Sequence, residues 1–188
     1  MAEPDRLESL PEIEAAIWRE LGRAALDKHH EWRTLVLATT DGDAPDARTV
    51  ILREADAGAR CLVAYTDARA HKVQQLQAQP RAVLVMWSRR LSWQLRLQAE
   101  IQVHTDGLAA TSRWAMLQSS PAASDYLAPQ APGEALDASA APAHTAAHPR
   151  HHFAVLMVQV QAIDWLELRR EGHRRAAFGQ QGARWLVP

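Results

Sequence analysis

The sequence has a single cysteine, Cys61, in 188 residues, which excludes an intramolecular disulfide. No stretch approaches the ~20 consecutive apolar residues of a membrane-spanning helix, and the N-terminal segment MAEPDRLESLPEIE lacks the apolar core of a secretory signal. The formal net charge is only −1, so the chain lacks the broad basic field that attracts nucleic acid. These absences predict a cytoplasmic protein without nucleic-acid or membrane partners.

The signatures of several enzyme classes are also missing. The sequence contains no G-x-S-x-G, no P-loop, no G-x-G-x-x-G and no C-x-x-C pair, so a Ser/His/Asp hydrolase has no local support. Four histidines gather late in the chain, but their spacing fits no helix- or strand-based ligand set and no cysteine lies nearby. We therefore predict no metal site from His144, His148, His151 and His152.

Length and composition suit one globular domain covering residues 1–188, with 47% hydrophobic and 23% charged residues. The chain opens with a predicted amphipathic helix over residues 9–29, which we expect to cover an opening of a sheet. Ser9 and Glu12 have the spacing of a capping box at its start. Its apolar residues recur at helical spacing, at Leu10, Ile13, Ile17, Leu21 and Ala24.

After this helix the pattern changes to short apolar and β-branched runs, which are typical of strands. The predicted strands are residues 34–40, 48–53, 60–66, 82–87, 93–103, 153–169 and 185–187, with short helices over 68–78 and 108–118. The run 82–87 is apolar throughout, so we expect it to be buried on both faces. Residues 119–150 are rich in Ala and Pro and predict a long irregular loop, with Tyr126 and Leu127 expected as its anchors.

The clearest signal is residues 93–103, where apolar and polar residues alternate without a break. This period of two predicts a long strand with one buried face and one wet or ligand-facing side. Six or seven strands in mostly antiparallel order favour a barrel, because closure removes exposed sheet edges. The predicted fold class is therefore mainly β, an antiparallel barrel with inserted helices.

Two basic groups flank the second and third predicted strands. A helix N-terminus offers free N–H groups and partial positive charge, so basic side chains and a hydroxyl there favour a phosphate cradle. A plain solvated basic helix face is the alternative interpretation. The side chains in this predicted phosphate site are the basic residues and the one hydroxyl residue of the two groups: Arg48, Arg53, Thr66, Arg69, His71 and Lys72.

Gln94, which begins the polar face of the long strand, supplies both a donor and an acceptor. Such a side chain suits the edge of a flavin or a nucleobase, although a solvent-facing Gln is the alternative. Most of the seven tryptophans are expected in the core, with Trp165 among those that could line a ring-binding pocket.

Taken in order, several segments resemble the pyridoxamine 5′-phosphate oxidase superfamily, in particular its oxidase-related FMN-binding branch. RTVILR at 48–53 resembles R-x-V-L-L-K, and YTD at 65–67 resembles Y-T-N. AHK at 70–72 stands where the family has S-R-K, and WQLR at 93–96 resembles R-Q-V-R. IDW at 163–165 resembles I-E-F-W, and RWLVP at 184–188 resembles part of the family's C-terminal motif.

The resemblance implies an FMN-binding split β-barrel and a homodimer with FMN between the subunits. It also implies an oxidoreductase acting on an unknown small substrate, and no catalytic side chain is assigned. The FMN-binding positions that it implies are Arg48, Thr49, Val50, Ile51, Arg53, Tyr65, Thr66, His71, Lys72, Gln94, Trp165 and Arg175.

Departures from the family pattern leave alternatives open. Ala70 and His71 replace a Ser and an Arg of the phosphate grip, and Ala177 replaces an FMN-binding Arg. Residues 118–124 contain no Arg to hold a substrate phosphate. One alternative is a true pyridoxamine or pyridoxine 5′-phosphate oxidase that uses Arg174 or Arg175 as its anchor. Another is a non-catalytic flavin- or haem-binding protein, with histidines of 144–152 as candidate ligands.

Overall fold

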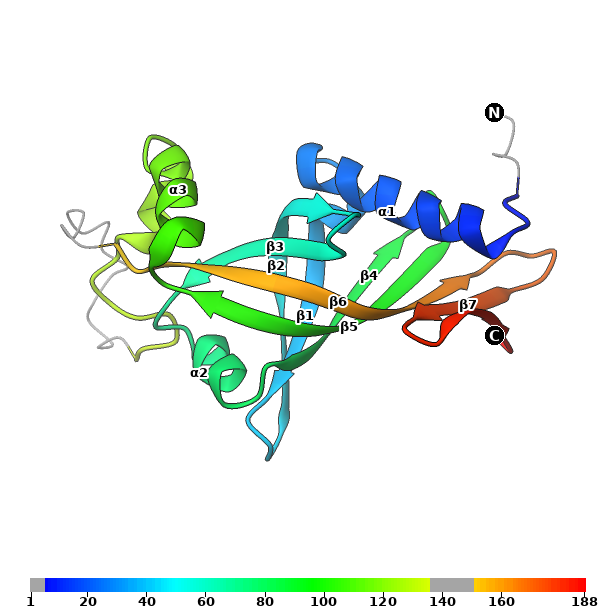
Figure 1. Ribbon diagram of the computed structural model, residues 1–188. Helices are drawn as coiled ribbons and strands as arrows, with labels where there is room; N and C mark the ends of the chain where they lie inside the picture. The colour runs from blue at the N-terminus through cyan, green and yellow to red at the C-terminus, as the bar shows by residue number, and fades with distance from the viewer. Residues whose placement is uncertain (1–5, 136–150) are drawn as a thin grey trace.

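The computed structural model describes residues 6–135 and 151–188, and in these ranges the chain forms a twisted antiparallel sheet with helices packed around it (Figure 1). The strands are β1 (Thr34–Thr40), β2 (Pro45–Asp56), β3 (Cys61–Asp67), β4 (Arg81–Ser88), β5 (Trp93–His104), β6 (Phe153–Glu167), β7 (Arg174–Gly179) and β8 (Gly182–Leu186). The helices are α1 (Leu10–Leu26), α2 (His71–Ala78) and α3 (Gly107–Leu117), with 3₁₀ turns η1 (Glu31–Arg33) and η2 (Pro121–Tyr126).

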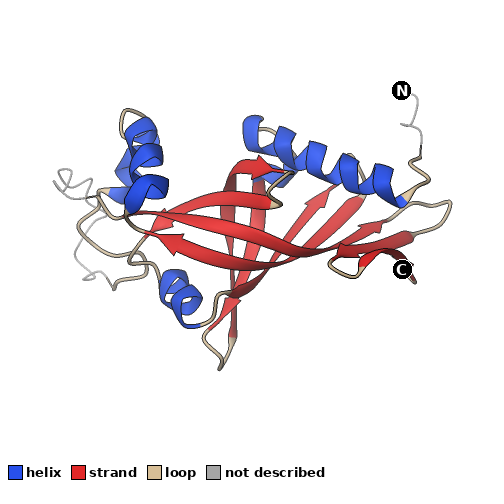
Figure 2. Cartoon of the chain, in the orientation of Figure 1, coloured by secondary structure: helices blue, strands red, loops and turns tan. Residues whose placement is uncertain are grey.

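Six of these strands close into a barrel. The sheet order is β3-β2-β1-β4-β5-β6-β7-β8, and an additional pairing of β3 with β6 joins its first strand to its sixth. The first half of β6 pairs with β3, whereas its second half pairs with β7 and continues into an open extension (Figure 2). The mainly β, antiparallel barrel expected from the sequence is therefore confirmed, with β7 and β8 added outside the closed part.

Helix α1 lies across the strands on one side of the sheet (Figure 1). Its capping box is present, because the Ser9 hydroxyl accepts from the Glu12 N–H and the Glu12 side chain accepts from the Ser9 N–H. The apolar stripe of α1 is buried in the main core. The helix ends at Leu26 instead of near residue 29, because Asp27 is extended and its carboxylate accepts the N–H of His29 at 2.8 Å.

Strand β5 alternates as the sequence indicates, with its apolar residues buried inside the barrel. Strand β4 does not match the prediction of burial on both faces. Its inward side chains are buried, but Val83 and Val85 on the outer face are partly exposed and Trp87 is 45% exposed. Among the described residues no helix covers this outer face. The apolar composition of β4 therefore did not tell whether one face of the strand or both faces are buried.

Three further regions differ from the sequence prediction. Residues 174–179 lack an alternating apolar pattern and were not predicted as a strand, yet they form β7 because the second half of β6 supplies a pairing partner. The predicted loop 119–150 begins with η2, where Tyr126 is buried as an anchor, and residues 136–150 lie outside the described ranges. Cys61 begins β3 but is only partly buried. No described helix is long and apolar enough to cross a bilayer.

A buried carboxylate fastens the N-terminal segment to the end of β6. The Glu167 side chain is 1% exposed and accepts from Trp93 Nε1 at 3.2 Å, Arg6 Nε at 3.1 Å and Arg174 Nε at 2.8 Å. Burial raises the pKa of Glu167, but the indole N–H of Trp93 and the guanidinium of Arg174 lower it more, so its pKa lies below the ordinary 4.5. The carboxylate stays charged because its partners replace the water that it lost.

Replacing this carboxylate should destabilise the fold. We expect Glu167→Gln to lower the free energy of unfolding at neutral pH by about 3 kcal/mol, because buried guanidinium charge then lacks its partner. Because the folded-state pKa is depressed, the wild-type advantage is lost as the pH falls through it, so the difference should shrink at acid pH. Urea denaturation of the variant and of a Glu8→Gln control, whose side chain is 79% exposed, tests this. Equal stabilities at neutral pH would contradict it.

Candidate functional site

A group of polar side chains meets where β3 ends and α2 begins. β3 ends at Asp67, whose carboxylate accepts the N–H of Arg69 at 2.8 Å and so turns the chain toward α2. Lys72, in the first turn of α2, donates from Nζ to Oγ1 of the buried Thr66 at 3.0 Å. The N-cap residue Ala70 makes no side-chain cap, so the first turn of α2 has no side-chain acceptor there. This helix end therefore suits an anion.

Arg48 reaches this helix end from β2. Its guanidinium donates to the Leu37 carbonyl at 3.3 Å, to the Thr39 hydroxyl and to Gln75 Oε1 at 3.1 Å. Burial lowers the pKa of Lys72, and the positive charge of Arg48 lowers it further. Two cations are thus held close enough to repel, and an anion between them would relieve that repulsion. We call Arg48, Thr66, Lys72 and the N-terminus of α2 the phosphate cradle.

Two side chains in this region were not identified from the sequence. Gln75 is 2% exposed and accepts from Thr39 Oγ1 at 2.6 Å, which fixes the surroundings of Arg48. Asp46 forms an ion pair with Arg48, and its Oδ2 also lies 3.8 Å from Nδ1 of the exposed His71. Sequence spacing offered a signal for both. Asp46 is two residues from Arg48 on a strand, so the two share a face, and Gln75 is three residues from Lys72 on a helix, so they lie on one side.

Arg69, from the same basic run, does not join the cradle. Its guanidinium is engaged by Asp67, and it also donates to the carbonyls of Ala128 and Pro129 at 2.9 and 3.0 Å. It therefore ties α2 to the segment after η2.

A second set of predicted residues lies on the outer face of the sheet. Gln94 on β5 is opposite Leu166 on β6, which is opposite Arg175 on β7, so Gln94 and Arg175 share a row. Arg175 forms a bidentate pair with Asp164, at 2.9 and 2.7 Å, and this hydrogen bonding raises the pKa of Arg175. The strand register puts Gln94 three strands away from Arg48 and three residues along, on the order of 17 Å. Within one chain, the cradle and the row that holds Gln94 and Arg175 are therefore far apart.

The remaining predicted residues have different surroundings. Thr49 is exposed on β2 and Ile51 is partly buried. Val50 is 8% exposed and packs in the main core, so its side chain is not open to a ligand. Trp165 is 0% exposed and packs edge-on against Trp93 at 5.4 Å, so its ring is a core element of this chain.

Tyr65 packs against a small second core under α3, and Arg53 lies next to Tyr65. The Arg53 guanidinium lies over the Tyr65 ring, 5.3 Å from its centroid, and the Tyr65 hydroxyl donates to Glu54 at 3.3 Å. Burial raises the pKa of Tyr65, and the carboxylate of Glu54 adds to this. Arg113 from α3 holds Glu54 in a bidentate pair at 2.7 and 2.6 Å. Glu54 and Arg113 were missed because their partnership spans 59 residues of sequence.

The histidines of the late loop are only partly described. His144 and His148 lie outside the described residues, whereas the His151 ring packs against Trp114 at 4.3 Å. In residues 6–135 and 151–188, no group of three His, Cys, Asp or Glu side chains is placed to share a metal ion.

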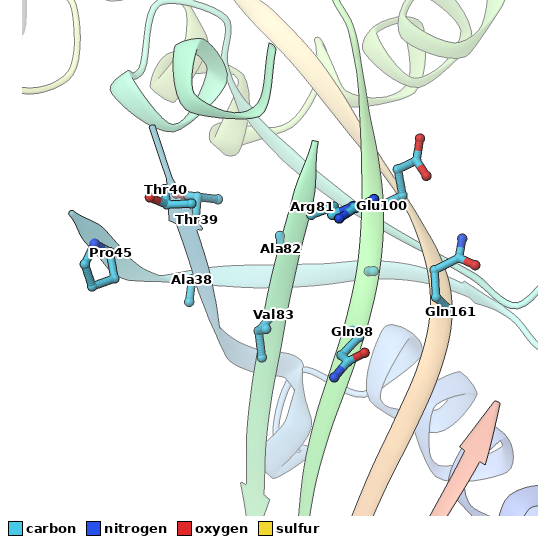
Figure 3. Close-up of a pocket in the computed structure, with 11 residues that line it drawn as sticks. Ala38, Thr39, Thr40, Pro45, Arg81, Ala82, Val83, Gln98, Glu100 and Gln161 are labelled. Atoms are coloured by element: carbon cyan, nitrogen blue, oxygen red, sulfur yellow. The ribbon is translucent and has the colours of Figure 1, made fainter. Parts of the chain in front are cut away.

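A cavity of about 620 Å³ opens on the outer face of the sheet, over β1, β4 and β5 (Figure 3). Its walls are mostly small or apolar, with Gln98 and Gln161 as amide groups and Arg81 and Glu100 as charged ones. None of the residues predicted from the sequence lines it. The cavity adjoins the cradle through Thr39, which belongs to its lining and also bonds Arg48.

Comparison with known proteins now identifies the family. The family model for the pyridoxamine 5′-phosphate oxidase FMN-binding domain matches residues 15–105. The pyridoxine/pyridoxamine 5′-phosphate oxidase of Thermosynechococcus vestitus is 31% identical over 166 residues, which cover 82% of this chain and 77% of that protein. The chain belongs to the pyridoxamine 5′-phosphate oxidase FMN-binding domain family.

Other members of the pyridoxamine 5′-phosphate oxidase family match over less of their length. The oxidase of Trichormus variabilis is 32% identical over 104 residues, 51% of this chain and 47% of that one, so the chain spans about half of this relative. Solved structures share the fold as well. An oxidase-related FMN-binding protein of Nostoc punctiforme has a TM-score of 0.73 at 22% identity, covering 97% of this chain and 100% of its own. PhzG of Burkholderia lata 383, solved with tetrahydrophenazine-1-carboxylic acid, has a TM-score of 0.75 at 18% identity and covers both chains fully.

The repulsion within the cradle has a measurable consequence in the ligand-free protein. Because the folded state lowers the pKa of Lys72, the charged ammonium destabilises the fold at neutral pH. We expect Lys72→Met to raise the melting temperature by about 2–4 °C, which corresponds to about 1 kcal/mol. The gain should shrink as the pH rises through the pKa of the wild-type lysine. Lys28→Met, at an exposed lysine, is the control, and a lower melting temperature for Lys72→Met would refute the idea.

Proposed function

We propose that this protein is an FMN-binding flavoprotein and an oxidoreductase that acts on a small substrate in the cytoplasm. The observation that carries the proposal is the cradle, where Arg48 and Lys72 converge with the Thr66 hydroxyl at the uncapped N-terminus of α2. This donor set suits a phosphate group, because it combines two cations, a hydroxyl and free backbone N–H groups. FMN, when bound, supplies hydride-transfer chemistry, and the protein holds and orients it.

The departures from the family pattern are compatible with FMN. Ala70 removes a side-chain hydroxyl and leaves the first turn of α2 without a side-chain cap. Ala177 removes a guanidinium, yet Arg184 stands directly opposite it on β8, exposed and on the same face of the sheet. Arg184 is therefore positioned to supply the positive charge that Ala177 lacks.

The substrate is proposed to differ from pyridoxamine phosphate. The segment after α3 contains Ser119, Ser120 and Ser124 but no Arg, so it offers no cation to a second phosphate group. Relatives named as pyridoxine/pyridoxamine 5′-phosphate oxidases support the reaction class, hydride transfer to flavin, more than this particular substrate.

We further propose a homodimer formed through the outer face of the sheet. On this face Val36 of β1 is 37% exposed and lies opposite Val85 of β4, and Val83 and the 45% exposed Trp87 are the neighbours of Val85 along β4. Apolar side chains gathered on one uncovered face are typical of a protein interface. A partner on this face would bring its own copies of outer-face groups such as Gln94 toward the first chain, which suits a flavin held between two subunits.

Removing the cradle arginine tests the flavin proposal. We expect Arg48→Ala to weaken FMN binding by about 10- to 100-fold, the loss of a charge-assisted hydrogen bond to phosphate, and to leave riboflavin binding nearly unchanged. Flavin absorbance near ~450 nm retained after desalting, followed by fluorescence titration, measures this. Arg89→Ala, an exposed arginine in the β4–β5 turn, should bind FMN as the wild type does. If the wild-type protein retains no flavin after excess FMN has been added and removed, the proposal is refuted.

A charge on the outer face tests the dimer. We expect Trp87→Asp to yield a monomer, because a carboxylate would be buried without a partner at an apolar interface. Size-exclusion chromatography with light scattering gives the mass directly. Leu26→Asp changes an exposed apolar residue at the end of α1, 89% exposed, and should stay dimeric. A dimeric Trp87→Asp variant, or a monomeric wild type, would rule out this interface.

A further inference from the structure

A carboxylate already occupies part of the phosphate cradle. Asp46 Oδ2 forms the ion pair with Arg48 Nη2 and lies 3.8 Å from Nδ1 of His71. The Asp46 side chain is 45% exposed and the Arg48 side chain 20% exposed, so the pair stands at the surface end of the cradle. A single carboxylate oxygen thus faces two basic groups, as one oxygen of a bound phosphate would.

The other acidic group near the cradle is already engaged elsewhere. Asp67 is 6% exposed, and both of its oxygens accept from Arg69, at 3.1 and 2.7 Å. Arg48 and Lys72 are then the cations left to face an arriving anion, and Asp46 is the carboxylate that faces them. Negative charge from Asp67 and then from Asp46 acts on Lys72 as well, since both carboxylates oppose the lowering of the Lys72 pKa.

Asp46 is not needed to hold Arg48 in place. The guanidinium already donates to the Leu37 carbonyl, the Thr39 hydroxyl and Gln75 Oε1, three uncharged acceptors that together fix its plane. Removing the Asp46 charge would leave these three bonds intact. The ion pair therefore adds charge neutralisation to an arginine whose orientation is otherwise determined.

We propose that Asp46 is a specificity-determining residue that competes with the ligand's phosphate for Arg48 and so weakens phosphate binding. The inference rests on the proposed flavin function for its natural ligand. A phosphate entering the cradle must take the place of the Asp46 oxygen on Arg48, and it then sits beside a carboxylate of the same sign. This penalty falls on the phosphate of FMN and not on its ring system, so riboflavin does not incur it.

Asp46→Asn removes the charge and keeps the size of the side chain. We expect this variant to bind FMN about tenfold more tightly, a modest gain because the pair is partly exposed and screened by water. Its affinity for riboflavin should stay within about twofold of the wild type. Asp43→Asn is the matched control, since it makes the same charge change at an exposed position of the β1–β2 turn, and it should leave FMN affinity unchanged.

Fluorescence titration with FMN and riboflavin supplies these affinities, and circular dichroism checks that each variant is folded. Unchanged or weaker FMN binding by Asp46→Asn would overturn the inference. So would an equal gain from Asp43→Asn, or an equal gain for riboflavin, since either would show a general charge effect instead of competition for Arg48.

Inorganic phosphate separates this inference from the proposed function. If neither the wild type nor Asp46→Asn binds FMN, the flavin proposal fails, but the cradle can still be titrated with phosphate by calorimetry. Tighter phosphate binding by Asp46→Asn, abolished when Arg48→Ala is added, would support the role of Asp46 without any flavin. Equal phosphate affinities in the wild type and Asp46→Asn would refute it.

Discussion

Seven residue pairs join β3 to β6, from Cys61 opposite Gln159 to Asp67 opposite Phe153, and this antiparallel contact closes the barrel. Closure gives β3 a partner on each side, so its edge is not left open. The β3–β6 pairing also places Thr66, near the end of β3, where α2 starts, beside β1 and β2. Arg48 and Lys72 come from separate elements, and the closed barrel is what brings them to one place.

The cradle is built at a cost to the ligand-free fold. Lys72 is partly buried beside Arg48, and like charges at short range raise the free energy of the folded state. Thr39 and Gln75 offset part of this cost, because they satisfy the guanidinium by hydrogen bonds instead of by water. Such local conflict is typical of functional sites, where residues are arranged for a ligand more than for stability.

Long elements with a clear period were predictable from the sequence. The alternation along β5 and the apolar stripe of α1 were found correctly, because one buried face dictates each pattern. β7 was missed, because its sequence carries no such pattern and it forms by pairing with β6. Within the site, Thr66 and Lys72 could be identified from their positions next to a helix start, and Arg48 from the basic pair that flanks a strand. Asp46 and Gln75 were missed, although their spacing from Arg48 and Lys72 offered a signal.

The sequence alone determined most of the local parts: where the described strands other than β7 and the helices form, and that Lys72 stands at a helix start just after the strand that carries Thr66. Those features depend on neighbours a few residues apart. The tertiary structure decided which strands pair, which face of β4 stays uncovered, and that Gln94 lies across the sheet from Arg48. Strand order and closure come from packing between distant segments, and no local period encodes which partner a strand will find.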